Sequence, residues 1–221
     1  MGKRPTLTAQ SGLTMKLSSH SFNDNAAIPG EYAFAVANAQ THYTLSANRN
    51  PHLAWTDVPE STQSFVVICH DPDVPSVGDD VNQEGKYISA TLPRVDFYHW
   101  LLIDIPATQM EITAGSHSSG ISQKGKNGPH IADGLRHGIN DYTGWFVSDP
   151  QMAGEYYGYD GPCPPWNDER VHRYIFTVYA VDIPTLQIKG PVNSQTVLDA
   201  LQGHVVAKAS LTGTYTLNMD V

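Results

Sequence analysis

The sequence predicts a mainly β fold, an antiparallel two-sheet β-sandwich with one C-terminal helix and long irregular loops. Short runs of aromatic and β-branched residues recur along the chain, and most are bounded by Pro, Gly, Asn or Asp. Helical periodicity is almost absent between these runs. Many strands with turn residues between them and few helices are typical of a sandwich.

Five runs are predicted strands. They are "YAFAV" at 32–36, "FVVIC" at 65–69, "FYHWLLIDIP" at 97–106, "YIFTVYAVD" at 174–182 and "GTYTLN" at 213–218. The fourth run is apolar at nearly every position, which indicates a central strand covered on both faces.

One segment, "SQTVLDALQGHVVAKASL" at 194–211, is a predicted helix. Its apolar residues repeat at roughly helical spacing, and Ser194 can cap its N-terminus. We expect this helix to cover a sheet face or an open edge, with His204 on it as a surface or packed residue.

The segment from Gly115 to Arg170 is Gly-rich, polar and without sustained period. An irregular stretch of this length inside a compact domain is usually a functional or binding loop. Its histidines, His117, His130 and His137, are expected to be solvated and show no metal-site spacing.

Composition favours a soluble globular protein. The chain has 221 residues, 40% of them hydrophobic, and no run near the roughly 20 apolar residues that span a bilayer. Membrane insertion is therefore not expected. The N-terminus lacks the apolar core of a secretory signal, so we expect a cytoplasmic protein, or a periplasmic one if a leader has been removed. Residues 1–14 are predicted to be an extension, and 15–221 a single domain.

The charge pattern argues against nucleic-acid binding. The net charge is −9 and no Lys/Arg cluster interrupts the acidity, whereas nucleic-acid binding depends on neutralising phosphates. Any anionic ligand must then be held in a local pocket. The two cysteines, Cys69 and Cys163, form no metal-ligand spacing and are predicted to be free thiols.

Three segments carry the candidate chemistry: "HDPDVP" at 70–75, "VDFYHWLLIDIP" at 95–106 and "YDGPCPPWNDERVHRYIFTVYAVD" at 159–182. Each joins a predicted strand to polar or Pro-rich residues, so their side chains can gather at one rim of a sandwich. The candidates are Asp71, Asp73, Asp96, His99, His172 and Tyr174.

In this combination and order, the segments closely resemble the phosphatidylethanolamine-binding protein family, which includes the Raf-kinase-inhibitor-like proteins. The first resembles the family's D-P-D-x-P box, the second its strand with His before "WLLI", and the third its G-x-x-P-P loop followed by H-R-Y. The stretches "NPHLAWTDVPESTQSFVV" and "ASLTGTYTL" are similar to the bacterial branch. The resemblance covers roughly residues 15–217.

The resemblance implies a sandwich with a small preformed anion pocket, about the size of a phosphate ion, at one end. Asp71, His99 and His172 would line it, with Tyr174 behind. The loop Cys163-Pro164-Pro165 would form a wall, although the family commonly has Gly where this chain has Cys163. The family's cis X-Pro bond would correspond to Val74–Pro75, at a cost of about 0.5–1 kcal/mol.

Residue chemistry supports such a pocket independently. Two histidines suit a phosphate or carboxylate, and a neighbouring Asp can orient an imidazole. Phosphoethanolamine matches better still, since Asp71 can meet its ammonium while His99 and His172 meet its phosphate. Asp73, with Pro75, is predicted to stabilise a turn through backbone N–H groups. No cofactor and no metal are predicted.

Other interpretations of the function stay open. Scattered Asp and His residues could form a metal-dependent or His/Asp-based hydrolase, and Cys163 with His172 as base is a further enzymatic alternative. The family also includes regulators that inhibit a kinase or protease, but no feature here identifies a protein target. A homodimer is conceivable, with an apolar patch from Trp100, Trp145, Trp166 or "GEYYGYDG", although buried aromatics explain these residues equally well.

Overall fold

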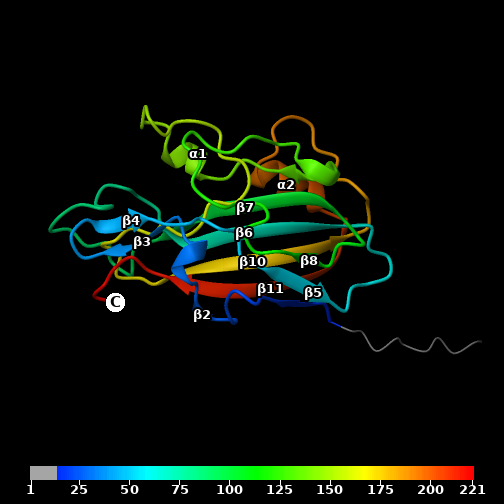
Figure 1. Ribbon diagram of the computed structural model, residues 1–221, viewed down its shortest axis with the longest axis horizontal. Helices are drawn as coiled ribbons and strands as arrows, with labels where there is room; N and C mark the ends of the chain where they lie inside the picture. The colour runs from blue at the N-terminus through cyan, green and yellow to red at the C-terminus, as the bar shows by residue number, and fades with distance from the viewer. Residues whose placement is uncertain (1–13) are drawn as a thin grey trace, which may run out of the picture.

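A six-stranded sheet forms the centre of the molecule in the computed structural model, which describes residues 14–221 (Figure 1). Its strand order is β2-β11-β10-β6-β7-β9, antiparallel throughout except for β2, which runs parallel to β11. The bounds are β2 Ala26–Ala27, β6 Ser64–Pro75, β7 Arg94–Pro106, β9 Arg136–His137, β10 His172–Val181 and β11 Val205–Tyr215.

A smaller sheet packs on one face of the large one. It contains β1 (Lys16–Ser18), β5 (Leu53–Thr56) and β8 (Glu111–Ile112). The main core lies between the two sheets, where Trp55 packs against Phe65 with ring centroids 5.1 Å apart. The predicted sandwich is therefore confirmed.

A β-hairpin of β3 (Ala35–Asn38) and β4 (His42–Leu45) lies at one end of the large sheet (Figure 1). The C-terminus and the loop that follows β6 lie at this same end. Segments far apart in the sequence therefore surround one end of the sandwich.

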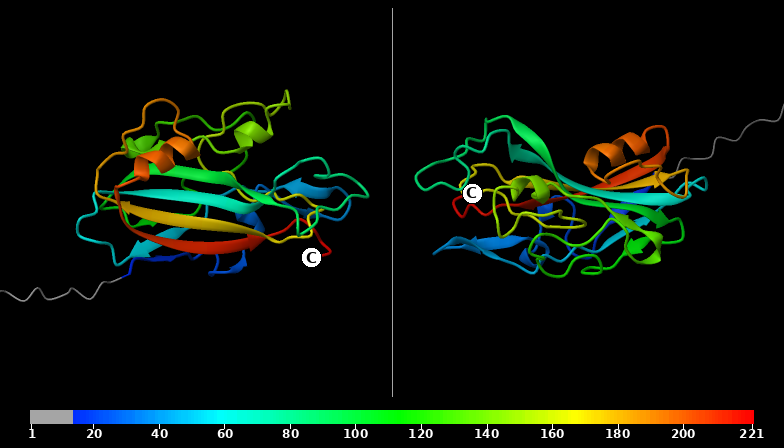
Figure 2. Two further views of the ribbon diagram at one scale, coloured as in Figure 1. Left: turned by 180° about the vertical axis from the view of Figure 1, so that it is seen from behind. Right: turned by 90° about the horizontal axis from the view of Figure 1, so that it is seen from above.

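Helix α2 (Ser194–Leu201) covers the other face of the large sheet (Figure 2). Val197 and Leu201 of the helix belong to one buried cluster with strand residues such as Val66 and Leu101. Because both faces of the central strands are covered, these strands are apolar at almost every position, as predicted for β10.

The C-terminal helix is much shorter than predicted. It ends at Leu201, and residues 205–215 form β11 instead of continuing the helix. Gly203 has a φ of +80°, a left-handed conformation that glycine adopts without strain and that ends helices. The cap is Asn193 and not Ser194, since the Asn193 side chain accepts a hydrogen bond from Thr196 N–H.

The irregular segment 115–170 contains two short elements besides β9: a 3₁₀ turn at Ala132–Gly134 and α1 at Tyr142–Trp145. His137 is buried, and its Nε2 lies 3.2 Å from Nδ1 of His117. The expectation of solvated loop histidines is therefore wrong for His137. Burial lowers the pKa of His137 to about 3, so its ring is neutral at ordinary pH.

Residues 1–13 lie outside the described part of the chain, and with them nearly all of the predicted extension 1–14. Between residues 14 and 221, none of the helices has the length and apolar character needed to cross a bilayer.

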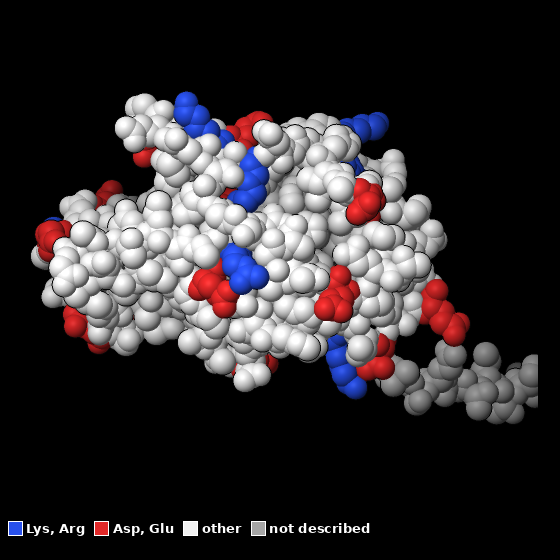
Figure 3. Space-filling view, viewed as in Figure 1, with Lys and Arg blue, Asp and Glu red and all other residues white. Residues whose placement is uncertain are grey.

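Lys and Arg side chains are dispersed on the face shown in Figure 3. Trp100 and Tyr156 are fully buried and so offer no apolar patch, whereas Trp145 is half exposed; a homodimer stays a prediction.

Candidate functional site

Strand β6 continues through "HDPDVP" to Pro75, where a turn was predicted, so Asp73 and Pro75 are strand residues. The pairing of β6 with β7 is irregular between Asp71 and Val74. Pro72 lies in this irregular stretch, where a residue without an N–H is tolerated. Asp71 Oδ1 accepts a hydrogen bond from Asp73 N–H at 2.7 Å. The box is thus a distorted strand end that Asp71 stabilises.

The prediction of a cis peptide bond at Val74–Pro75 is wrong. Within residues 14–221 the cis X-Pro bond is Gly128–Pro129, in the irregular segment. Since β6 keeps pairing with β7 at both Val74 and Pro75, the backbone here stays extended, as a strand requires.

Asp73 contacts arginines more than backbone groups. Its carboxylate accepts hydrogen bonds from Nε (2.9 Å), Nη2 (3.0 Å) and the backbone N–H (3.0 Å) of Arg173, and from Nη1 of Arg170 (3.1 Å). Burial alone would raise the pKa of Asp73, but these bonds lower it to about 2. Asp73 therefore links β6 to β10 as an ion-pair residue instead of stabilising a turn.

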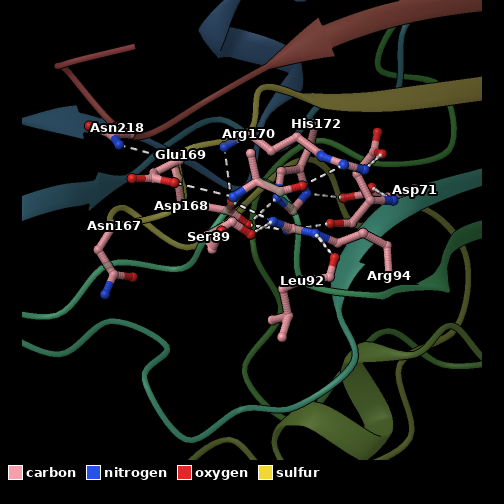
Figure 4. A network of polar contacts seen from close by, with 12 residues as sticks. Asp71, Ser89, Leu92, Arg94, Asn167, Asp168, Glu169, Arg170, His172 and Asn218 are labelled. Atoms are coloured by element: carbon pink, nitrogen blue, oxygen red, sulfur yellow. Dashed lines mark hydrogen bonds and ion pairs between the residues drawn. The ribbon is translucent and has the colours of Figure 1, made fainter.

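His172 is the centre of a buried chain of charges, shown in Figure 4. Its Nδ1–H donates to Asp71 Oδ2 at 2.6 Å, and its Nε2–H donates to Asp168 Oδ2 at 2.9 Å. Arg94 donates to both oxygens of Asp168, at 2.5 and 3.0 Å. Two cations and two carboxylates alternate along the chain, so it carries no net charge.

The two carboxylates hold His172 in its charged form. Burial opposes the charge, but the hydrogen bonds to Asp168 and Asp71 raise the pKa of His172 to about 9. Both N–H groups of the imidazolium are thereby used within the protein. The expectation that His172 donates directly to a phosphate does not match this arrangement; His172 positions Asp71 instead.

His99, on β7, is held in one tautomer by the backbone of Asp160. Its Nδ1–H donates to the Asp160 carbonyl at 2.8 Å, and Asp160 N–H donates to the His99 carbonyl at 3.1 Å. None of the described residues hydrogen-bonds to Nε2. Burial lowers the pKa of His99, so in the free protein Nε2 is a bare acceptor.

The Asp160 carboxylate is itself fixed by three donors. Lys126 Nζ lies 2.7 Å away, and the side-chain amides of Asn48 and Asn140 lie 2.8 and 2.9 Å away. Such an outer set of hydrogen bonds restrains the backbone that orients His99. The long irregular segment, which supplies Lys126 and Asn140, therefore supports the ring from behind.

All six predicted ligand-contacting residues line one cavity of about 450 Å³ at the hairpin end of the sheet. They are Asp71, His99, Cys163, Pro164, His172 and Tyr174. Pro75 lines it as well, whereas Asp73 and Asp96 do not. The cavity is larger than the phosphate-sized pocket expected, since residues of β4 and α1 line it as well. We call the part formed by Asp71, His99, His172 and Tyr174 the polar floor.

The Tyr174 hydroxyl is buried and close to the Asp71 carboxylate, but it makes no hydrogen bond of good geometry within residues 14–221. Burial, with the nearby Asp71 carboxylate adding to it, raises the pKa of Tyr174 well above its usual value, so the hydroxyl keeps its proton. Its ring lies 5.1 Å from the His99 ring, centroid to centroid. An unpartnered buried O–H is costly, and beside a cavity a ligand acceptor can satisfy it.

The Cys163 loop closes one side of the cavity. Gly161 lets this loop approach the chain near Tyr32, because a Cβ at Gly161 would lie 2.2 Å from the Tyr32 carbonyl oxygen. Burial raises the pKa of Cys163 to about 12, whereas a nucleophilic cysteine needs a lowered pKa. Cys163 thus acts as an apolar wall residue in this arrangement.

Asp96 lies away from the floor although it is close to His99 in sequence. Side chains alternate along β7, so Phe97 and His99 line the cavity while Asp96 points to the other face, 3.9 Å from His70. From residue 14 onward, no three His, Cys, Asp or Glu side chains are grouped so that they could hold a metal ion.

Sequence reasoning missed Asp168, Arg94 and Asp160. Asp168 could have been noticed because it lies four residues before His172 in "DERVH". Arg94 begins the strand that carries His99, but its pairing with Asp168 spans 74 residues and no local pattern indicates it. Asp160 acts on His99 through its backbone, which leaves no signal in residue type.

The fold and the floor together define a β-sandwich with a cavity at one end, and comparison with known proteins specifies the family. The sequence profile described as "Phosphatidylethanolamine-binding protein" matches residues 18–216. The chain belongs to the phosphatidylethanolamine-binding protein family.

Curated relatives and solved structures agree with this assignment. A UPF0098 protein of Methanothermobacter thermautotrophicus is 31% identical over 91% of this chain and 98% of its own. The UPF0098 protein YbhB of Escherichia coli is 29% identical over 91% of this chain and 99% of its own. Escherichia coli YbcL has the same fold, with a TM-score of 0.64 at 23% identity, covering 91% of this chain and 98% of its own. The structure of a Chlamydia trachomatis homologue of phosphatidylethanolamine-binding protein gives a TM-score of 0.60 at 25% identity. It covers 92% of this chain and 97% of its own.

Proposed function

We propose that this protein is a binding module, without turnover, metal or cofactor, for a small ligand with a phosphate- or carboxylate-type head group. The observation that carries the proposal is the free Nε2 of His99 on the polar floor, with the buried hydroxyl of Tyr174 beside it. One anionic oxygen can accept from Tyr174. Another can accept from His99 once its Nε2 takes up a proton.

The charges around the floor suit such a head group. The chain from Arg94 to Asp71 carries no net charge, so it does not repel an anion as an isolated Asp71 would. Each Asp71 oxygen already accepts one hydrogen bond and keeps a second lone pair. A ligand ammonium can use these lone pairs, so phosphoethanolamine, which carries both groups, is the favoured head group.

Isothermal titration with phosphoethanolamine tests the proposal, with Tyr174→Phe as the variant and Tyr179→Phe as its control. Both tyrosines lie on β10, but Tyr179 is outside the cavity lining. We expect binding at about micromolar to millimolar Kd. Loss of one hydrogen bond in Tyr174→Phe should weaken it about three- to tenfold, with no change in Tyr179→Phe. Equal affinities in both variants, or no binding at millimolar ligand, would contradict the proposal.

A further inference from the structure

Strand β4 is paired along one edge and open along the other. Within residues 14–221 its strand partner is β3, and the two form a sheet of their own. An open edge presents backbone N–H and C=O groups that can pair with a further strand. The far edge of β4 is therefore a possible attachment site for another extended chain.

The register identifies which residues form this open edge. Ser46 N–H, directly after β4, donates to the Phe34 carbonyl at 2.9 Å. Because hydrogen-bonded and non-hydrogen-bonded pairs alternate along an antiparallel ladder, Thr44 then bonds to β3. Tyr43 and Leu45 direct their N–H and C=O groups away from β3. The open edge thus offers two donors and two acceptors at the spacing of a strand.

This edge borders the mouth of the cavity. Tyr43 and Leu45 line the cavity while remaining 40% and 57% exposed. On the α1 side, Trp145 and Asp149 line it as well, and Trp145 is 53% exposed. A strand added to β4 would lie across the mouth, with every second side chain on the cavity side.

The surroundings of the mouth are acidic. The loop 76–93 supplies part of the lining and carries exposed Asp79, Asp80 and Glu84. Its one cation, Lys86, lies 3.7 Å from Asp80. Within residues 14–221 the lining includes no Lys or Arg. A cationic partner is therefore attracted, whereas an anionic lipid surface, or a second copy with the same net charge of −9, is repelled.

We infer that the open edge of β4 binds an extended segment of a partner protein, in which Lys or Arg side chains alternate with apolar ones. The segment adds as a third strand, through backbone hydrogen bonds to Tyr43 and Leu45. Its apolar side chains pack on Tyr43, Leu45 and Trp145, and the acidic loop attracts its cations. This inference goes beyond the head-group ligand and does not depend on it.

The peptide acetyl-KLKLK-amide, titrated into the nitrogen-15-labelled full chain, tests the inference by NMR. We expect binding at micromolar to millimolar Kd, with shifts of the Tyr43 and Leu45 amide signals. Deuterium exchange should slow more at these two amides than at Thr44, which is already bonded to β3. The charge-reversed acetyl-ELELE-amide should bind at least about tenfold more weakly.

Three results would overturn the inference. One is equal binding of the two peptides, and another is a set of shifts that leaves Tyr43 and Leu45 unchanged. The third is a concentration-dependent dimer that protects the same amides without peptide, since it would assign the edge to a second copy. None of these results bears on the head-group ligand, so the proposed function is tested separately.

The variant Leu45→Pro, compared with Leu45→Ala, isolates the backbone contribution. Both changes remove the leucine side chain, but only proline removes the outward N–H, and an edge strand tolerates proline at such a position. Leu45→Pro should bind acetyl-KLKLK-amide about three- to tenfold more weakly than Leu45→Ala. Equal affinities would contradict strand addition. Amide signals of β3 report whether the hairpin is kept, and if proline disturbs it, exchange in the wild-type protein still decides.

Discussion

Nδ1 of His172 lies 2.6 Å from Oδ2 of Asp71, and the same imidazole donates its other N–H to Asp168. His172 thus lines the cavity, but both of its N–H groups are used by the two carboxylates. Its contribution is to fix Asp71 and to neutralise the charge behind the floor. The residues left to contact an anion are His99 and Tyr174.

The first prediction concerns stability against pH. The folded-state pKa of His172 is raised to about 9 from an ordinary value near 6.5, so its stabilisation is fully present below about pH 6.5 and is lost as pH rises through 9. The loss should be on the order of 3 kcal/mol. Urea unfolding of wild type and His172→Gln at pH 6.5 and 9.5 measures this loss. The difference in unfolding free energy between the two proteins should be smaller at pH 9.5 than at pH 6.5.

His204→Gln is the matched control for this experiment. His204 also binds an aspartate, Asp182, but both side chains are about two-fifths exposed. Its stability difference from wild type should stay small at both pH values. If wild type and His172→Gln differed in unfolding free energy by the same amount at pH 6.5 and 9.5, the result would contradict a buried imidazolium.

The second prediction concerns Asp168. Asp168→Asn leaves the buried Arg94 without a carboxylate partner and leaves His172 with Asp71 alone, so the unfolding free energy should fall by about 3–5 kcal/mol. Asp182→Asn, which removes the exposed partner of His204, should cost about 1 kcal/mol or less. Chemical denaturation compares the two, and similar small losses would show that the chain of charges is not structural.

The third prediction distinguishes Asp73 from Asp96, two carboxylates close to the box. Asp73→Asn weakens its bonds to Arg170 and Arg173 and should lower the unfolding free energy by about 1–3 kcal/mol. Asp96→Asn changes an exposed side chain and should have little effect. Thermal unfolding at neutral pH measures both, and an equal response would mean that Asp73 does not link β6 to β10.

The fourth prediction concerns ligand affinity against pH. Because burial lowers the pKa of His99, an anion that needs a proton on Nε2 should bind more tightly as pH falls below about 6.5. Sulfate is a suitable probe because its charge is constant from pH 5 to 8. Calorimetry should show this trend in wild type and a flat profile in His99→Gln. A trend that survives in His99→Gln would assign the pH dependence to another group.

Much of the fold was predictable because it is local or periodic. Strand β10 follows directly from its apolar run, and the three motif segments indicated which residues would converge. The C-terminal helix was overextended since Val197, Leu201 and Val205 fit a helical period that Gly203 interrupts. Burial of both ring nitrogens of His172 could not be predicted, because its partners Asp71 and Asp168 meet only in the folded chain. The size of the cavity could not be predicted either, because it depends on how segment 142–152 packs.

Nitrogen-15 NMR of the histidine side chains, with and without phosphoethanolamine, tests the central claim most directly. We predict that Nε2 of His99 changes from unprotonated to protonated when the ligand binds. Both ring nitrogens of His172 should be protonated throughout. A His99 signal that does not respond to ligand, or a neutral His172 that becomes protonated instead, would contradict the account.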